Sequence, residues 1–135
     1  QAGREGTAHK HPDQLRAYDY VLRATMSIDR WTPQGYKQSK ADLEKAIELD
    51  PAYGRARQEY AWLMLIGWFY QYENGPAPPS EIKQNAIRSV DLDPGDARTH
   101  RTAAFGYFLD KQLDLFAKEA KIALDLAPND AEILV

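Results

Sequence analysis

Residues 46–51 read AIELDP, and the same pattern returns as SVDLDP at 89–94 and as ALDLAP at 123–128. Each copy has a small residue, an aliphatic residue, an acidic residue and a leucine, and each ends in a proline. Because proline cannot continue a helix, each copy predicts the last turn of a helix and its end. The second and third prolines lie 34 residues apart, and the first and second lie 43 apart. The spacing predicts a chain that is built from repeats.

The middle repeat is nine residues longer than the last, and residues 74–79, NGPAPP, lie within the insertion. This density of glycine and proline is incompatible with a helix, so we expect an exposed irregular loop there. Elsewhere, apolar residues recur at three- and four-residue spacing, which predicts helices that pair as hairpins. The helices are expected at about 12–29, 33–51, 53–72, 80–93, 96–109 and 113–126, with Thr32, Ser80 and Asp96 as N-terminal caps.

The predicted fold class is therefore all-α, an α-solenoid of three helical hairpins followed by the start of a further helix. The hairpins are expected at about 12–51, 52–94 and 95–128, after a flexible tail or linker at 1–11 and before a helix stub at 129–135. The lack of an initiating methionine indicates that the chain is part of a longer protein.

Composition excludes several classes of function. The chain has 135 residues, a net charge of −3 and an isoelectric point near 5.6, which gives no basic surface for nucleic acid or an anionic membrane. It has no cysteine, so disulfides and thiolate metal sites are excluded. No stretch approaches the about 20 apolar residues of a membrane span. We expect one domain in the cytoplasm, with no nucleic-acid or membrane partner.

The repeat unit resembles the tetratricopeptide-repeat family, which has the same period. At the places where that family has small residues, so that two helices can touch, this chain has Ser27, Ala46, Ala61, Ser89, Ala104 and Ala123. In the third unit a large and a small residue exchange places, as Phe116 and Ala120, and the exchange conserves volume. We therefore expect Phe116 to be buried against the neighbouring helix. The resemblance implies three tetratricopeptide hairpins and a function in protein–protein interaction.

A narrower resemblance rests on three stretches, AYDYVLRA at 17–24, WTPQG at 31–35 and AIELDPAYGRA at 46–56. They are similar to the repeat region downstream of the catalytic domain in bacterial class III adenylate/guanylate cyclases, and to that of related winged-helix transcriptional regulators. The resemblance implies a soluble, intracellular bacterial signalling protein in which this piece is regulatory. A nucleotide cyclase domain, if present, would lie elsewhere in the parent protein.

Candidate catalytic and metal-binding residues are few. His9 and His11 are expected in the flexible tail, and His100 is expected to pack on its helix without a nucleophile or carboxylate on the same face. The acidic residues between 91 and 96 lack the pattern of a calcium loop, and no glycine-rich phosphate loop is present. We therefore expect no enzymatic activity, no catalytic residues, no cofactor and no metal in this piece.

The functional face is instead expected on the concave groove that the first helices of successive hairpins line in the tetratricopeptide-repeat family. Carried over position by position, the groove positions are Val21, Ala24, Ile28, Trp31 and Thr32 in the first unit, Arg55, Gln58, Trp62, Leu65 and Ile66 in the second, and Arg98, Arg101, Phe105, Phe108 and Leu109 in the third. Of these, we expect the following to bind the partner: Trp31, Arg55, Gln58, Trp62, Leu65, Arg98, Arg101, Phe105 and Phe108. Family members that hold the acidic C-terminus of chaperones use Lys and Asn in this groove. Here the ninth position holds Ile28, Trp62 and Phe105, so we expect no such carboxylate clamp. In a regular stack of hairpins we expect Trp62 and Phe105 to lie side by side on the floor of the groove.

An apolar groove with arginines at its rim suits a protein or peptide segment that has large apolar anchors and some negative charge. The segment could belong to a partner or to a neighbouring domain of the same protein. Two alternatives stay open at this stage. The groove could mediate self-association as a homodimer, or the chain could be a structural spacer without a specific groove ligand.

Overall fold

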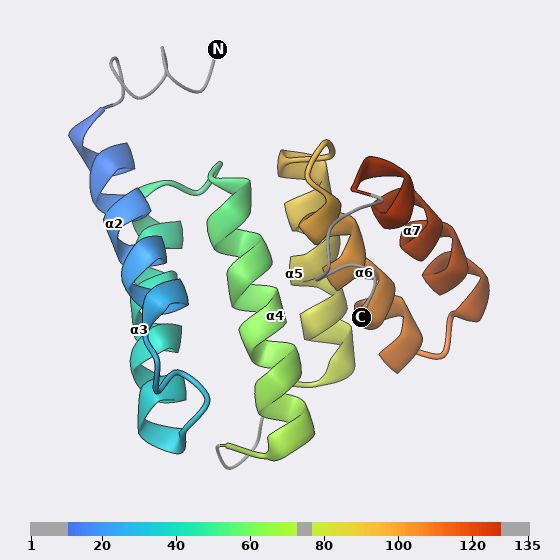
Figure 1. Ribbon diagram of the computed structural model, residues 1–135, viewed down its shortest axis with the longest axis horizontal. Coiled ribbons are helices and arrows are strands. Elements are labelled where there is room, and N and C mark those ends of the chain that lie inside the picture. The colour runs from blue at the N-terminus through green and yellow to red at the C-terminus, as the bar shows by residue number, and fades with distance from the viewer. Residues whose placement is uncertain (1–10, 73–76, 128–135) are drawn as a thin grey trace.

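The computed structural model describes residues 11–72 and 77–127, and within them the chain forms six helices and no strand (Figure 1). The helices are α2 (Pro12–Met26), α3 (Pro33–Leu49), α4 (Gly54–Tyr70), α5 (Pro79–Leu92), α6 (Ala97–Leu109) and α7 (Leu113–Leu126). The prediction of an all-α chain is confirmed. The tail at 1–10, the first half of the predicted loop, at 74–76, and the predicted helix at 129–135 lie outside the described residues.

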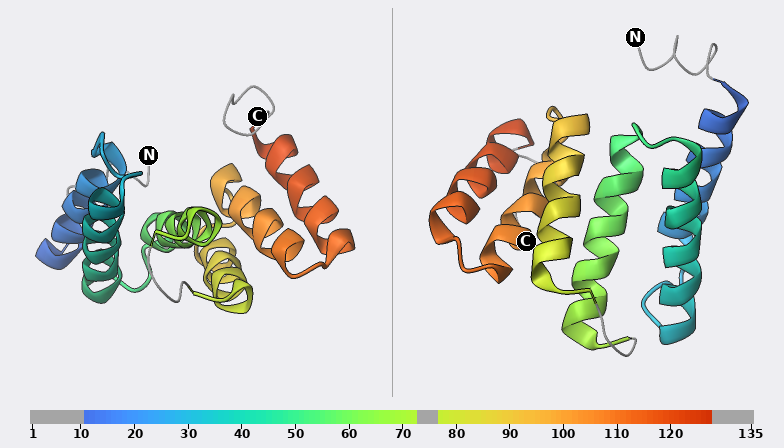
Figure 2. Two further views of the ribbon diagram at one scale, coloured as in Figure 1. Left: turned by 90° about the horizontal axis from the view of Figure 1, so that it is seen from below. Right: turned by 180° about the vertical axis from the view of Figure 1, so that it is seen from behind.

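Consecutive helices pack as the hairpins α2–α3, α4–α5 and α6–α7, and the hairpins stack in one row (Figures 1 and 2). Each hairpin contacts the next through α3 and α4 or through α5 and α6, and the first helices α2, α4 and α6 also touch in sequence. In the left view of Figure 2, α4 and α6 lie on one side of the stack and α5 on the other. This arrangement is the predicted helical-hairpin solenoid.

The repeated sequence pattern forms the same structure each time. The second helix of every hairpin ends at the leucine of the pattern, and the following residue, Asp50, Asp93 or Ala127, caps it. The backbone N–H of that residue donates to the carbonyl oxygen four residues earlier, at Ala46, Ser89 or Ala123. A proline follows each cap, and its ring prevents another helical turn. The repeated pattern therefore marks where α3, α5 and α7 end, as predicted.

Small residues allow close contact between helices, as the repeat pattern predicts. Ala46, Ala61, Ser89, Ala104 and Ala123 are all buried, and Ser39 is buried with its hydroxyl donating to the Ala24 carbonyl at 3.3 Å. Ser27, predicted with them, is only half-buried, because α2 ends at Met26 and Ser27 is its C-cap. Larger apolar side chains, such as Leu43, Leu63 and Val21, fill the core between the first hairpin and α4. Phe116 is half-buried rather than buried, and its ring packs against Phe108 of α6 with centroids 5.3 Å apart.

Several helix ends differ from the predicted positions. α2 ends at Met26 rather than near residue 29, so Ile28 and Trp31 lie in a loop, where Ile28 is fully exposed. α5 begins at Pro79, which suits the first turn of a helix, and Ser80 lies inside the helix instead of capping it. His11 is the N-cap of α2 and accepts from the backbone N–H of Asp13 at 3.2 Å.

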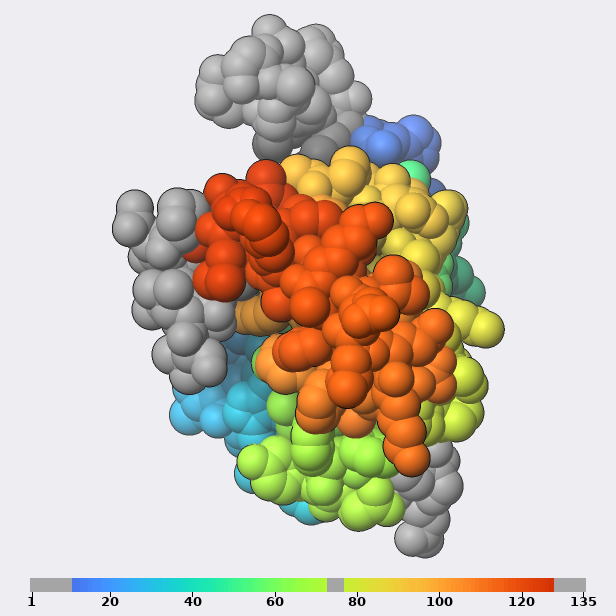
Figure 3. Space-filling view, turned by 90° about the vertical axis from the view of Figure 1, so that its right-hand side faces the viewer, coloured from blue at the N-terminus to red at the C-terminus, as the bar shows by residue number. Residues whose placement is uncertain are grey.

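α7 forms the outer layer at the C-terminal end of the row (Figure 3). Several of its leucines are exposed there, among them Leu113, Leu124 and Leu126. On its inner side α7 is tied to α6 by the buried His100, whose Nδ1 lies 2.6 Å from Glu119 Oε1. The other ring nitrogen, Nε2, lies 2.7 Å from the Pro94 carbonyl oxygen. His100 is therefore a packed histidine, as predicted, but with a carboxylate partner from the neighbouring helix.

Candidate functional site

Four arginines from three parts of the chain gather on one face of the stack. Arg30 lies in the loop between α2 and α3, Arg55 lies in the first turn of α4, and Arg98 and Arg101 lie on α6. With their neighbours they line an open hollow of about 430 Å³, which we call the arginine pocket. Its lining residues are Thr25, Met26, Arg30, Trp31, Arg55, Glu59, Trp62, Arg98 and Arg101.

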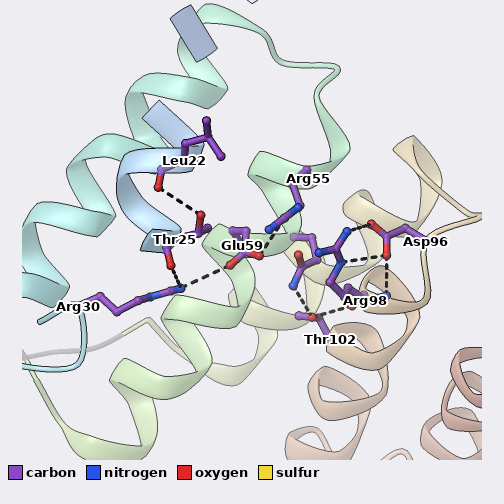
Figure 4. A network of polar contacts seen from close by, with 9 residues as sticks. Leu22, Thr25, Arg30, Arg55, Glu59, Asp96, Arg98 and Thr102 are labelled. Carbon is purple, nitrogen blue, oxygen red and sulfur yellow. Dashed lines mark hydrogen bonds and ion pairs between the residues drawn. The ribbon is translucent and has the colours of Figure 1, made fainter. Parts of the chain in front are cut away.

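Glu59 lies at the centre of this pocket (Figure 4). Its carboxylate accepts a hydrogen bond from Arg55 Nε at 3.0 Å and another from Arg30 Nη2 at 3.4 Å. Only 9% of its side chain is exposed, so the charge is largely desolvated and depends on the two guanidinium groups. Glu59 therefore holds Arg30 and Arg55 in fixed positions at the pocket wall.

The loop after α2 positions Arg30 although no helix carries it. Arg30 Nη1 donates to the Thr25 carbonyl at 3.2 Å, and the guanidinium lies over the Trp31 ring, 4.4 Å from its centroid. The Tyr72 hydroxyl, just beyond α4, donates to the Trp31 carbonyl and attaches the loop to the end of that helix. The early end of α2 thus places Arg30 and Trp31 beside α4.

Arg98 is positioned by the start of its own helix (Figure 4). Asp96 is the N-cap of α6, as predicted, and its side chain accepts from the Arg98 backbone N–H at 2.9 Å. Arg98 Nε and Nη2 donate to the two carboxylate oxygens of Asp96, each at 3.2 Å. Burial alone would raise the pKa of the Asp96 carboxyl, but the hydrogen bonds and charge of Arg98 outweigh it and lower that pKa below its usual value.

Arg101, Trp62 and Phe105 form one packed group between α4 and α6. The Arg101 guanidinium lies 4.3 Å from the centroid of a Trp62 ring, a cation–π geometry. The Trp62 and Phe105 rings meet edge to face, with centroids 5.7 Å apart. Their predicted positions side by side are confirmed. Trp62 is half-buried and Phe105 is 37% exposed, so a ligand can reach both rings.

A second hollow, of about 490 Å³, adjoins the arginine pocket toward the C-terminal end of α4. We call it the aromatic pocket, and its lining residues are Trp31, Trp62, Ile66, Tyr70 and Tyr72. The rings of Tyr70 and Tyr72 stack with centroids 5.7 Å apart, which gives the wall a defined shape. Because Trp31 and Trp62 line both hollows, the two pockets form one continuous surface.

The structure brings together some predicted groove residues and not others. Trp31, Arg55, Trp62, Arg98 and Arg101 line the pockets. Gln58 and Leu65 are instead buried beneath the surface. The side chain of Gln58 turns toward α6 and donates to Thr102 Oγ1 at 3.1 Å, and Leu65 packs with Met64 and Ile82 inside the middle hairpin.

Phe105 and Phe108 do not line these pockets: Phe105 adjoins them through its contact with Trp62, and Phe108 instead contacts Phe116 of α7. The sequence did not single out the following lining residues: Thr25, Met26, Arg30, Glu59, Tyr70 and Tyr72. Three of them could have been suspected from their positions: Arg30 adjoins a predicted groove tryptophan, and Glu59 and Tyr70 lie four and fifteen residues after Arg55, which is the same helix face. Nothing in the sequence points to the contact of Tyr72 with Trp31.

No protein-family model matches the chain, and no curated protein matches it in sequence. Its structure is similar to the first tetratricopeptide repeat of Spaghetti (RPAP3), solved with the HSP90 peptide SRMEEVD. The TM-score is 0.69, with 93% of this chain and 90% of the other covered. The fold is that of a tetratricopeptide-repeat domain. At 14% identity the likeness concerns the fold alone, and the narrower resemblance to cyclases and winged-helix regulators gains no support from these comparisons.

The described part of the chain offers neither a metal site nor a membrane span. Within it, no group of three histidine, aspartate or glutamate side chains is placed to hold a metal ion. None of the described helices combines the length and the apolar character needed to cross a membrane. What the site does offer is a concave surface with guanidinium groups at one end and aromatic rings at the other, which can bind a ligand without a chemical step.

Proposed function

We propose that this chain is a protein-interaction module whose concave face, formed by the arginine and aromatic pockets, binds a segment of another protein or of a neighbouring domain. The group of Arg101, Trp62 and Phe105 carries the proposal, because its members pack together at a reachable surface between two first helices. Tryptophan and arginine are enriched among the residues that dominate protein interfaces. Helical-repeat folds present such residues on extended concave surfaces.

Two observations support a protein segment as the ligand. The solved tetratricopeptide repeat with the similar fold is bound to a peptide, HSP90 SRMEEVD. The pockets of this chain together run along α4 as an open surface, which fits an elongated ligand better than a compact small molecule. For the setting we keep the expectation from the sequence, a regulatory piece of a bacterial, cytoplasmic signalling protein without enzymatic activity of its own.

The proposal is tested by selecting peptides from a random displayed library on the immobilised chain. A selected peptide is then added to the chain while amide hydrogen exchange is followed. Protection concentrated on α4, α6 and the loop at 27–32 is the expected result. Protection confined to α3, α5 or the outer side of α7 would place the binding surface elsewhere and refute the proposal.

Self-association is the competing function, because the exposed rings beside the pockets could meet a second copy of the chain. Sedimentation velocity at several concentrations separates the two. No dimer through these rings is expected here. If the chain instead forms a dimer at high concentration and Phe105→Ala abolishes that dimer, the concave face is the interface of a homodimer and not a site for another segment.

A further inference from the structure

The outer side of α7 carries an apolar stripe. Among the described helices α7 packs against α6, and it forms the outside of the row in Figure 3. Leu113, Ala117, Ala120 and Leu124 follow one another at intervals of four, three and four residues, which places them on one face. We call these four residues the α7 seam. Leu113 is 59% exposed and Leu124 is 40% exposed, so the seam is open to a ligand.

The same positions are used for helix packing in the first two hairpins. Counted back from the proline of the repeated pattern, the seam lies 15, 11, 8 and 4 residues before it. In α3 these positions include Tyr36 and Leu43, which are buried in one cluster with Leu63 of α4. In α5 they include Ala86, which is buried with Ala103 of α6. The seam is therefore the flank through which a second helix packs against another helix.

One position of the seam departs from the pattern of the other two hairpins. Eleven residues before the proline, α3 has Lys40 and α5 has Lys83. Lys83 Nζ donates to the Asp110 carboxylate and, at 2.8 Å, to Gln112 Oε1, and so holds the turn after α6. In α7 this position is Ala117, which has no such donor. The seam therefore lacks the contact by which α5 attaches the next hairpin.

The seam is instead complementary to itself. Its order, leucine, alanine, alanine, leucine, and its spacing are the same in both directions. In an antiparallel pair of α7 helices, Leu113 opposes Leu124 of the second copy, and Ala117 opposes Ala120. Every contact then occurs twice about a two-fold axis. The central alanines allow the helix axes to approach to about 8 Å, and the leucines bury each other at both ends.

The charges beside the seam also fit an antiparallel second copy. Asp114 and Lys121 are exposed, and each follows a seam residue on the side of α7 away from Phe116 and Ala123, which face α6. Antiparallel packing brings Asp114 near Lys121 of the second copy, and the reverse, whereas parallel packing would bring like charges together. Lys121 also pairs with Asp125 at 3.1 Å, but both side chains are largely exposed, so this ion pair is weak.

We infer that two copies of the chain associate through their α7 seams, which pack antiparallel about a two-fold axis. No seam residue lines the arginine pocket or the aromatic pocket. The dimer therefore leaves both concave faces open, and a partner with two binding segments meets two sites at once. The inference is independent of the proposed function, because it concerns another surface.

The test is sedimentation equilibrium of the 135-residue chain between about 5 and 500 µM. We expect a reversible dimer with a dissociation constant of about 10–100 µM, because one helix from each copy makes a small interface. Leu124→Lys should weaken the dimer by about tenfold or more. Leu126→Lys is the matched control, because Leu126 is 44% exposed but lies on the opposite flank of α7, and it should change the dimer by less than about twofold. Thermal melts followed by circular dichroism check that each variant is folded.

Two further experiments test the orientation of the helices. Asp114→Lys and Lys121→Asp should each weaken the dimer by about threefold or more, and the double variant should recover it, because opposite charges again face each other. The chain has no cysteine, so Leu113→Cys and Leu124→Cys can be oxidised separately or as a mixture. We expect an intermolecular disulfide in the mixture only, because antiparallel packing brings these two positions together.

A monomer at every concentration would overturn the inference. So would a dimer that Leu124→Lys does not weaken, or a disulfide from Leu113→Cys alone, which indicates parallel helices. A dimer that Phe105→Ala abolishes would also overturn it, because the interface would then lie on the concave face. The proposed function is judged separately, by whether a selected peptide protects α4 and α6.

Discussion

The buried contact between Gln58 and Thr102 gives a stability prediction that tests how the floor of the groove is built. Gln58 is fully buried, and its Nε2 donates to Thr102 Oγ1 at 3.1 Å. The threonine hydroxyl in turn donates to the Arg98 carbonyl at 2.9 Å. The Gln58 Oε1 atom is also buried, and within the described residues it has no hydrogen-bond partner. The amide is therefore held by one hydrogen bond across the interface of α4 and α6.

Thr102→Val keeps the shape of the side chain but removes the acceptor, so the buried amide loses its one hydrogen bond. An unsatisfied buried polar group costs about 1–3 kcal/mol, which lowers the melting temperature of a chain of this size by roughly 3–5 °C per kcal/mol. Gln58→Leu in the same background replaces the stranded amide by an apolar side chain of similar size. The double variant should therefore recover most of the lost stability.

The free energy of unfolding is measured by urea denaturation of the wild type, the two single variants and the double variant. We expect Thr102→Val to be the least stable of the four. If the double variant is less stable than Thr102→Val, and the two losses simply add, then the side chains do not interact and the reasoning is refuted.

Three more variants test the packing and one of the caps. Gly67→Ala should lower the free energy of unfolding by about 1–3 kcal/mol, because the added Cβ would lie 2.5 Å from the Tyr36 hydroxyl oxygen. Urea denaturation measures this loss, and Gly95→Ala is the control, because the added Cβ there would meet no atom within 4 Å. Ala104→Leu should cost a similar amount by overpacking the third hairpin, and a thermal melt identical to that of the wild type would contradict the assigned register. Because the pKa of Asp96 is lowered on folding, its charge stabilises the fold above the unfolded pKa and ceases to do so as pH falls through the folded pKa. Thermal melts between about pH 6 and pH 2 should therefore show a smaller acid destabilisation for Asp96→Asn than for the wild type, and equal pH dependence would contradict this account.

Local sequence signals predicted much of the fold. A proline that follows a leucine and a capping residue ends a helix wherever it occurs, so the repeated pattern placed the ends of α3, α5 and α7. Likewise, Ala61 and Ala104 are buried where the repeat register expects contact. The end of α2 has no such proline, and there the predicted boundary was wrong by three residues.

The site was harder to predict because its contacts join distant parts of the chain. Gln58 looked like a groove residue, but its partner Thr102 is 44 residues away and draws it into the core. Arg30 and Glu59, 29 residues apart, meet only once the loop after α2 has folded back on α4. Helical periodicity identifies a face and does not show which neighbour packs against it. The predicted role of the remaining groove residues in binding stays a prediction.

The central claim, that the exposed rings between α4 and α6 form a binding site rather than a core, is tested most directly by Trp62→Ala. A library-selected peptide is titrated by calorimetry into the wild type, into Trp62→Ala and into Phe69→Ala, an exposed aromatic of the same helix outside both pockets. Circular dichroism checks that each variant keeps its helices. The account predicts a loss of about 2 kcal/mol or more, roughly thirtyfold in affinity, for a folded Trp62→Ala and no loss for Phe69→Ala. Unfolding of Trp62→Ala, or a folded variant that binds the peptide like the wild type, would contradict it.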